Sequence, residues 1–198
     1  MNGLYKTIVS RRTVRFFKDK KVPPGLIKKV VNAARLAPSA ANLQFLEYLA
    51  IGDKALRQEV FNCASWAGYV FPDRVPPEGK RPAGFIVILV NHKKSSNPDQ
   101  RDIGAAAQNM LLALESLGLA GCWIGKFDRP RLSKILDLPA NCNIDSLVAF
   151  GYPAERPKLE EDADNIKYWL DKNNRLHVPK RPLKDIMRFN CFRSQKPR

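Results

Sequence analysis

The feature that most constrains the fold is a continuous apolar run, Phe85–Val90, followed by a strongly periodic helix. An unbroken apolar run of this length is typical of a strand buried on both faces. From residue 103 to residue 117, apolar side chains recur at steps of three and four, with Asp102 as the expected N-cap and Gly118 as the stop. The two elements together predict a central strand covered by helices.

Weaker patterns place shorter elements around this pair. We expect helices over residues 4–10, 26–37, 54–63 and 131–138, and strands over 48–51, 119–125 and 146–150. Asp53 is the expected N-cap of the helix at 54–63. Residues 66–82 carry four prolines among aromatic side chains and predict an irregular, lid-like loop or a surface connection. With 198 residues, positions 1–198 are most simply one domain.

Positive charge is concentrated at the two ends of the chain. The formal net charge is +15, of which residues 1–35 contribute +9 and the basic tail at 175–198 contributes +7, so that residues 36–174 sum to −1. Such ends suit either a nucleic-acid-binding module with basic arms or two termini that converge on an anionic ligand. Aromatic side chains are mostly not interleaved with the basic ones, as a base-stacking platform would require. The second interpretation is therefore favoured, and the first stays as the alternative.

Several classes of protein are disfavoured by what the sequence lacks. The four cysteines are widely spaced and form no C-x-x-C pair, which argues against a structural zinc site and fits a reducing cytoplasm. No apolar run is long enough to span a bilayer, so we expect a cytoplasmic protein without membrane contact. P-loop, G-x-G-x-x-G and G-x-S-x-G motifs are absent, and the two histidines show no metal-ligand spacing. We therefore predict no catalytic side chain and no metal ligand, and an enzyme would need a cofactor.

Residues 11–15, Arg-Arg-Thr-Val-Arg, place three guanidiniums and a hydroxyl within five positions. Such a density of donors suits one phosphate group, because Arg can grip its oxygens two at a time. Taken alone, the cluster also fits a solvated basic turn.

Five segments, taken together and in order, resemble the small FMN-dependent nitroreductase family over nearly the whole chain. They are residues 11–17, 37–44, 102–104, 121–125 and 150–153, and residues 180–183 also fit. The resemblance implies an α+β fold in three α/β/α layers, with a mostly antiparallel sheet flanked by helices, built as an intertwined homodimer. It also implies one non-covalent FMN in each of two clefts at the subunit interface.

Carried over by position, the resemblance implies a set of cofactor-binding residues. Arg11, Arg12 and Thr13 would hold the phosphate and ribityl chain, and Arg15 would lie towards the pyrimidine edge of the ring. The loop from the other subunit would contribute Pro38, Ser39, Ala40, Asn42 and Gln44. The backbone of Cys122, Trp123, Ile124 and Gly125 would line the isoalloxazine, and Lys180 or Arg181 would close over the phosphate.

The activity implied is a ping-pong transfer of electrons. NAD(P)H would give a hydride to flavin N5, and a small-molecule acceptor such as a nitroaromatic or a quinone would then take the electrons. The same scaffold also hosts dehalogenation, flavin fragmentation and dehydrogenation of peptide-derived rings, which stay open as alternatives. Residues 66–82 and the acidic stretch near Glu160 offer no match, and such regions shape the acceptor pocket in this family.

Overall fold

The computed structural model describes residues 3–192. The chain falls into two compact units, Met1–Glu155 and Arg156–Arg198. None of the helices among the described residues is long and apolar enough to cross a membrane.

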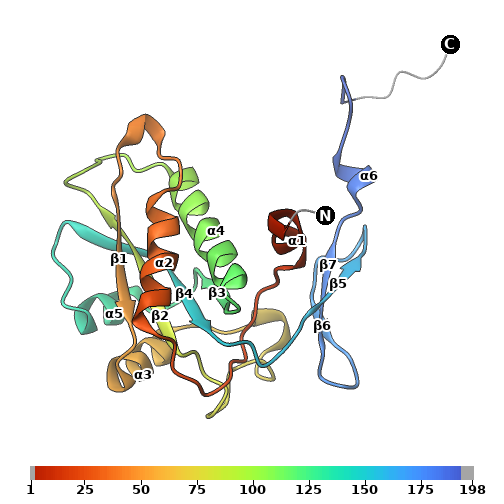
Figure 1. Ribbon diagram of the computed structural model, residues 1–198, viewed down its shortest axis with the longest axis horizontal. Helices are drawn as coiled ribbons and strands as arrows, with labels where there is room; N and C mark the ends of the chain where they lie inside the picture. Colours follow the sequence, from red (N-terminus) through yellow and green to blue (C-terminus); the bar gives the residue numbers. More distant parts are fainter. Residues whose placement is uncertain (1–2, 193–198) are drawn as a thin grey trace. The chain divides into compact units, whose positions relative to one another are not determined.

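The first unit is built on a four-stranded antiparallel sheet (Figure 1). Its strands, in spatial order, are β1 (Leu46–Ile51), β2 (Gly84–Asn91), β4 (Cys142–Gly151) and β3 (Ala120–Ile124). In the register of the sheet, Val87 of β2 lies opposite Leu49 on one side and Leu147 on the other. The two central strands, β2 and β4, carry the most continuous burial.

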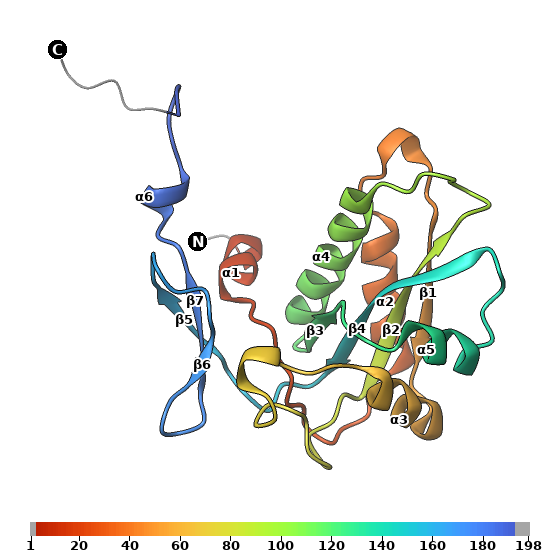
Figure 2. The same cartoon turned by 180° about the vertical axis from the view of Figure 1, so that it is seen from behind.

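Helices cover both faces of this sheet (Figures 1 and 2). Helices α2 (Pro24–Arg35) and α4 (Gln100–Ser116) pack on one face, and α3 (Lys54–Cys63) and α5 (Arg129–Ile135) pack on the other. Successive side chains of β2 alternate between the two cores, with Ile86 and Ile88 in the first and Phe85 and Val87 in the second. The predicted three-layer α/β/α fold and the two-sided burial of Phe85–Val90 are therefore confirmed.

The sequence predicted one helix cap correctly and another wrongly. Asp53 caps α3 as expected, accepting a hydrogen bond of 2.8 Å from the backbone N–H of Leu56. Asp102 is not the N-cap of the long helix, because α4 begins at Gln100 and the capping side chain is that of Asp99. Asp102 lies inside the first turn and is buried.

Element boundaries differ from the expected ones by a few residues. Helix α2 begins at Pro24 instead of residue 26, because proline is well suited to the first turn, and it ends at Arg35 instead of residue 37. Helix α5 begins directly after its cap Asp128 and ends at Ile135. Strand β4 extends well before the expected 146–150, since its first residues pair with the end of β2.

Helix α1 (Gly3–Ser10) opens the chain and contributes no buried residue. The segment after it runs in extended form along the outer edge of β3, where the N–H of Val14 donates to the carbonyl of Gly121 at 3.1 Å. Further on, the N–H of Lys18 donates to the carbonyl of Tyr152 at 2.8 Å. Residues 14–18 are thereby joined to the edge of β3 and to the end of β4.

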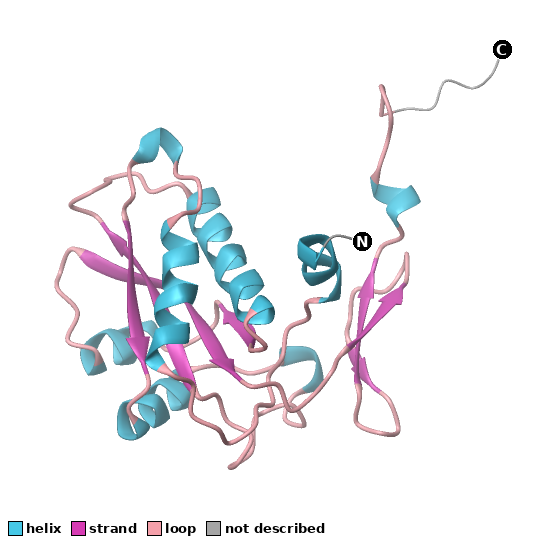
Figure 3. Cartoon of the chain, viewed as in Figure 1, coloured by secondary structure: helices cyan, strands magenta, loops and turns pink. Residues whose placement is uncertain are grey.

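Residues 66–82 form an irregular loop that contains only the short 3-10 turn η2 (Gly68–Val70), as Figure 3 shows. Trp66 and Arg74 are buried, while Tyr69 and Phe71 are exposed. The irregular loop expected from the prolines is therefore present.

The second unit contains a small sheet that the sequence did not predict. Its strands, in spatial order, are β5 (Lys158–Glu161), β7 (Leu176–Lys180) and β6 (Trp169–Leu170), and the short helix α6 (Leu183–Ile186) follows. His177 lies in the middle strand, with its Nδ1 2.7 Å from Glu160 Oε1 and its Nε2 3.3 Å from Asp171 Oδ2. The ring of Trp169 stacks on it at 5.2 Å between centroids.

Candidate functional site

The arginine segment, residues 11–15, is held in place by its contact with β3. Val14 is buried and hydrogen-bonded to Gly121, so it anchors the segment at its centre. Side chains alternate in direction along an extended chain, so Thr13 and Arg15 point away from the side that Val14 occupies. Both are half-buried.

Arg11 carries the most unusual side chain of this segment. Its Nε and Nη1 are buried and have no hydrogen-bond partner among residues 3–192. Burial, and then the charge of Arg12, lower the pKa of Arg11, while Glu115 acts in the opposite direction. Arg12 lies beside it and donates from Nη1 to the carbonyl of Arg11 at 2.6 Å. The unsatisfied buried donors of Arg11, with a second guanidinium beside them, fit an anionic ligand such as a phosphate.

The loop between α2 and β1 carries the second predicted group of residues. Ser39 donates from its hydroxyl to Asp102 at 2.7 Å and accepts from the N–H of Gln44 at 3.1 Å. The N–H of Ala40 also donates to the carboxylate of Asp102, at 3.0 Å to Oδ2. Asp102 therefore fixes this loop to the first turn of α4, and the Ser39 hydroxyl has only one acceptor position left for a ligand.

The backbone of this loop is held in a left-handed conformation. The φ angles are 49° at Ala41, 55° at Asn42 and 48° at Gln44, a region that residues other than glycine seldom occupy. Such strain persists only where the surroundings impose it, and it clusters at ligand sites. The side chains of Pro38, Asn42 and Gln44 are exposed, and Gln44 donates to the carbonyl of Asn42 at 3.3 Å.

In one chain, the two predicted groups lie at opposite ends of α4. The loop is bound to Asp102 in the first turn, whereas Arg11 lies near Glu115 in the last turn. A helix of 17 residues is about 25 Å long, far more than one phosphate or one ring system spans. Within a single chain, the arginine segment and the loop are therefore too far apart to bind the same phosphate or ring system.

The stretch Cys122–Gly125 forms the end of β3 and the residue after it. Cys122 and Ile124 are buried in the core on the α3 and α5 side, while Trp123 is 44% exposed. The carbonyl of Gly121 points to the outer edge of β3, where it accepts from Val14. Because backbone groups alternate in direction along a strand, the N–H groups of Trp123 and Gly125 point to the same edge. The predicted role of this stretch requires such backbone donors.

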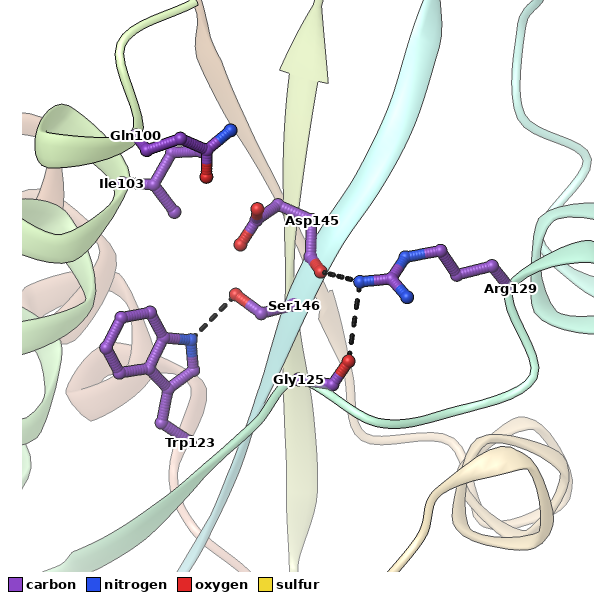
Figure 4. Close-up of a pocket in the computed structure, with 7 residues that line it drawn as sticks. All are labelled: Gln100, Ile103, Trp123, Gly125, Arg129, Asp145 and Ser146. Carbon is purple, nitrogen blue, oxygen red and sulfur yellow. Dashed lines mark hydrogen bonds between the residues drawn. The ribbon is translucent and has the colours of Figure 1, made fainter.

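A pocket of about 420 Å³ opens beside this stretch (Figure 4). The indole of Trp123 donates to the hydroxyl of Ser146 at 2.7 Å. Arg129 donates from Nη2 to the carbonyls of Asp145 at 3.0 Å and Gly125 at 3.3 Å. Gln100 and Ile103, from the first turn of α4, complete the wall. Its size lies in the range of small-molecule sites.

Lys180 and Arg181 belong to the second unit. Lys180 is the last residue of β7, and Arg181 donates from Nη2 to the carbonyl of Asp185 at 3.2 Å. Both side chains are exposed. Their closure over a phosphate stays a prediction.

Three residues that sequence reasoning did not assign to the site lie next to it. Asp102 belongs to one of the segments that carry the family resemblance, which could have assigned it to the site. The helical pattern instead favours the interpretation that it is an N-cap. Arg74 and Glu155 had no local signal. They form a buried ion pair beside residues 15 and 16, although they lie far from those residues and from each other in the sequence.

Comparisons with known proteins agree with this fold. A family model described as the nitroreductase family matches residues 8–152. A protein of Archaeoglobus fulgidus, provisionally named an NADH dehydrogenase/NAD(P)H nitroreductase, is 29% identical over 84% of this chain and 94% of its own length. An iodotyrosine deiodinase of Thermotoga neapolitana is 24% identical over 85% and 98%. A provisionally assigned nitroreductase of Desulfovibrio desulfuricans, solved in complex with FMN, superposes with a TM-score of 0.72 at 22% identity, covering 100% of this chain and 99% of its own.

Proposed function

The chain belongs to the nitroreductase family, and from this premise we propose that it is an FMN-dependent oxidoreductase that uses NAD(P)H to reduce a small-molecule acceptor. Nitroaromatics and quinones are the acceptor classes we expect. The D. desulfuricans structure contains FMN, and the A. fulgidus relative is named for NAD(P)H, which supports both parts of the proposal.

The observation that carries the proposal is the unsatisfied guanidinium of Arg11. Buried polar nitrogens without acceptors are costly, and an anionic group restores the missing hydrogen bonds. The terminal phosphate of FMN is such a group, and Arg12 lies beside Arg11 to share it. Thr13 would add a hydroxyl.

The separation along α4 supports a homodimer with FMN at the subunit interface. The arginine segment of one chain would meet Ser39, Asn42 and Gln44 of a second copy, because its own loop is bound at the opposite end of α4, about 20 Å away along the helix. Helix α1 supports the same assembly, since its apolar side chains are exposed. These are Leu4, Tyr5, Ile8 and Val9.

When bound, FMN would accept a hydride from NAD(P)H and pass electrons to the acceptor in a ping-pong sequence. Arg15 would place positive charge at the pyrimidine edge of the ring, which favours a reduced, anionic ring. The outer edge of β3 would present backbone N–H groups to it. Lys180 or Arg181 would close over the phosphate, so that residues 1–198 would act as one FMN-binding domain. We assign no acid or base to a side chain.

A flavin assay tests the proposal directly. Purified protein should be yellow, release FMN on denaturation and oxidise NADH or NADPH when a nitroaromatic or a quinone is present. Stopped-flow reoxidation with a panel of acceptors would identify the preferred one. A colourless protein that does not take up added FMN would contradict the proposal.

Two alternatives have distinct outcomes in the same experiments. Reductive dehalogenation is favoured by the similarity to the iodotyrosine deiodinase, and it predicts halide release from a halophenol faster than nitroaromatic reduction. A nucleic-acid-binding module, suggested by the net charge of +15, predicts tight and strongly salt-dependent binding of nucleic acid without flavin.

A further inference from the structure

One carboxylate joins the arginine segment to the loop at residues 66–82. Glu155 accepts at Oε1 from the backbone N–H of Arg15 at 2.6 Å and from that of Phe16 at 3.0 Å. Its Oε2 forms an ion pair with Nη2 of Arg74. The side chains of Arg74 and Glu155 are only 3% and 11% exposed. The pair is therefore largely removed from water.

Arg74 depends on this carboxylate. Its guanidinium lies 4.0 Å above the centre of the Phe16 ring. Burial in the first place, and the nearby charge of Arg15 in the second, lower the pKa of Arg74 to about 10. Both causes disfavour a charge at this place, and a buried charge left without its partner is strongly destabilising. Glu155 supplies the balancing charge.

The loop at residues 66–82 has few other attachments to the arginine segment. Beyond the ion pair, the N–H of Phe17 donates to the carbonyl of Lys80 at 2.9 Å. Tyr69 and Phe71 are more than half exposed and bury little apolar surface. Beside Arg74, Val75 packs against the apolar core on the α3 and α5 side, so the contact between Arg74 and Glu155 is the charged link between this part of the loop and the arginine segment.

We propose that Glu155 is a positioning residue that couples the order of loop 66–82 to the geometry of the arginine segment. It fixes the backbone at Arg15 and Phe16, from which the Arg15 side chain projects, and it holds the loop through Arg74. The inference rests on the proposed function in so far as the arginine segment holds FMN. A ligand bound by Arg11–Arg15 and the ordered state of the loop then stabilise one another.

Glu155→Gln tests the coupling because it changes charge more than shape. The amide oxygen can still accept from the two backbone N–H groups, but the side chain no longer balances Arg74. In apo protein, we expect chymotrypsin to cleave after Tyr69 about tenfold faster than in the wild type, since the loop opens more often. The dissociation constant for FMN should rise by about tenfold as well, because FMN binding must then also restore the order of the loop.

Two further variants make the experiment decisive. Glu59→Gln is the matched control, because it removes a carboxylate from an exposed pair with Arg131, and it should change neither rate nor affinity. The double variant Glu155→Gln with Arg74→Gln leaves no buried charge, so it should fold even if Glu155→Gln does not. It should still show rapid loop cleavage and weaker FMN binding.

Loop cleavage within twofold of the wild type in the folded variants would overturn the proposal. So would weaker FMN binding without faster cleavage, because Glu155 would then act on the arginine segment alone. If the wild type binds no FMN at all, the proposed function fails, whereas the cleavage rates in apo protein still decide whether Glu155 holds the loop.

Discussion

Arg11 combines burial, charge and unsatisfied donors in one side chain. Arg12 has a backbone acceptor, and Arg15 lies beside the ion pair of Arg74 and Glu155. Among these arginines, Arg11 is therefore the one whose hydrogen bonds a bound phosphate would complete. A bound phosphate would also balance the neighbouring positive charge of Arg12.

Arg11→Ala should reduce the affinity for FMN by about 1.5–3 kcal/mol, the range for a hydrogen bond to a charged group. Fluorescence titration of the apo protein with FMN measures this loss. Arg131→Ala is the control, because Arg131 is an exposed guanidinium that pairs with Glu59 on α5's side of the sheet. Equal affinities for Arg11→Ala and wild type would mean that Arg11 does not hold the phosphate of FMN.

The two aspartates at the start of α4 show what a local pattern can predict. Asp99 and Asp102 are both good capping residues, and the apolar periodicity begins only at Ile103. The pattern therefore favoured the later aspartate, although the helix begins earlier. The true role of Asp102 depends on Ser39 and Ala40, which are contributed by a different element and leave no trace in the local sequence.

The ion pair of Arg74 and Glu155 could not be predicted for a similar reason. Single charged residues in loops are usually solvated, and nothing in the sequence distinguishes these two from the rest. Only the fold, which brings the end of β4 beside the arginine segment, makes them buried partners. Position-by-position resemblance predicts residues that would touch a ligand, but it does not predict those that support them.

Helix α4 and strand β3 approach so closely that the strand needs a glycine. A Cβ added at Gly121 would lie 2.8 Å from Cδ1 of Leu114 and 3.1 Å from Cδ2 of Leu111. It would also lie 3.2 Å from the backbone carbonyl of Ala149, which cannot move as easily as a side chain. The close packing of α4 on β3 fixes the position of the edge of β3. It also fixes the arginine segment, because Val14 is hydrogen-bonded to Gly121.

Gly121→Ala should destabilise the fold by about 1–3 kcal/mol, the usual cost of overpacking a core. Urea denaturation of apo protein measures the free energy of unfolding. Gly104→Ala, in the helix α4 that packs on β3, is the control, because a Cβ there meets nothing within 4 Å. That change should stabilise the protein by about 0.5–1 kcal/mol, since alanine favours a helix over glycine. Similar effects of the two variants would contradict this packing argument.

The small sheet of the second unit should loosen in acid. Hydrogen bonds from Lys158 first, and from His177 second, lower the pKa of Glu160 below its ordinary 4.5. The backbone N–H of Arg175, followed by His177, lowers the pKa of Asp171 below 3.8. A lowered pKa in the folded state means that the carboxylate stabilises the fold above its ordinary pKa and that this stabilisation is lost as the pH falls.

We therefore expect the NMR signals of Trp169, which stacks on His177, to broaden or shift as the pH falls from about 4.5. In Glu160→Gln the neutral side chain should flatten this response. Asp164→Asn serves as the control, because Asp164 is an acid of the same unit that does not contact His177. A Trp169 response that is unchanged in Glu160→Gln would contradict the assignment.

At the scale of elements, the sequence was informative where burial is strong. The unbroken run in β2 and the periodicity of α4 each predicted the type and the core contacts of their element. The second unit was missed because β5 and β7 are short, and they pair in parallel across intervening residues. Only that pairing makes them strands, and nothing in their own composition predicts it.

For the whole molecule, the exposed apolar face of α1 bears on assembly. Ile8→Glu should weaken a dimer by roughly tenfold or more, since burying one such side chain contributes about 1.5–3 kcal/mol. The fold of the monomer should stay intact, because α1 contributes no buried residue. Sedimentation velocity over a range of concentrations measures the dimer dissociation constant.

Lys6→Gln is the matched control for Ile8→Glu. It makes the same change in charge on the same helix, but it does not touch the apolar face formed by Leu4 and Ile8. A flavin-loaded wild type that sediments as a monomer would contradict the proposed assembly.

The position of the two groups at opposite ends of α4 has a consequence for mixed populations of chains. Arg11→Ala damages only the segment, and Asn42→Ala damages only the loop. In a hybrid of these two chains, one site would carry both defects, and the other would be assembled from the two undamaged halves. Refolding the two variants together should therefore restore tight FMN binding to one site per hybrid, although neither variant has such a site alone. Intersubunit complementation of this kind is available only to a protein whose sites are each divided between two chains.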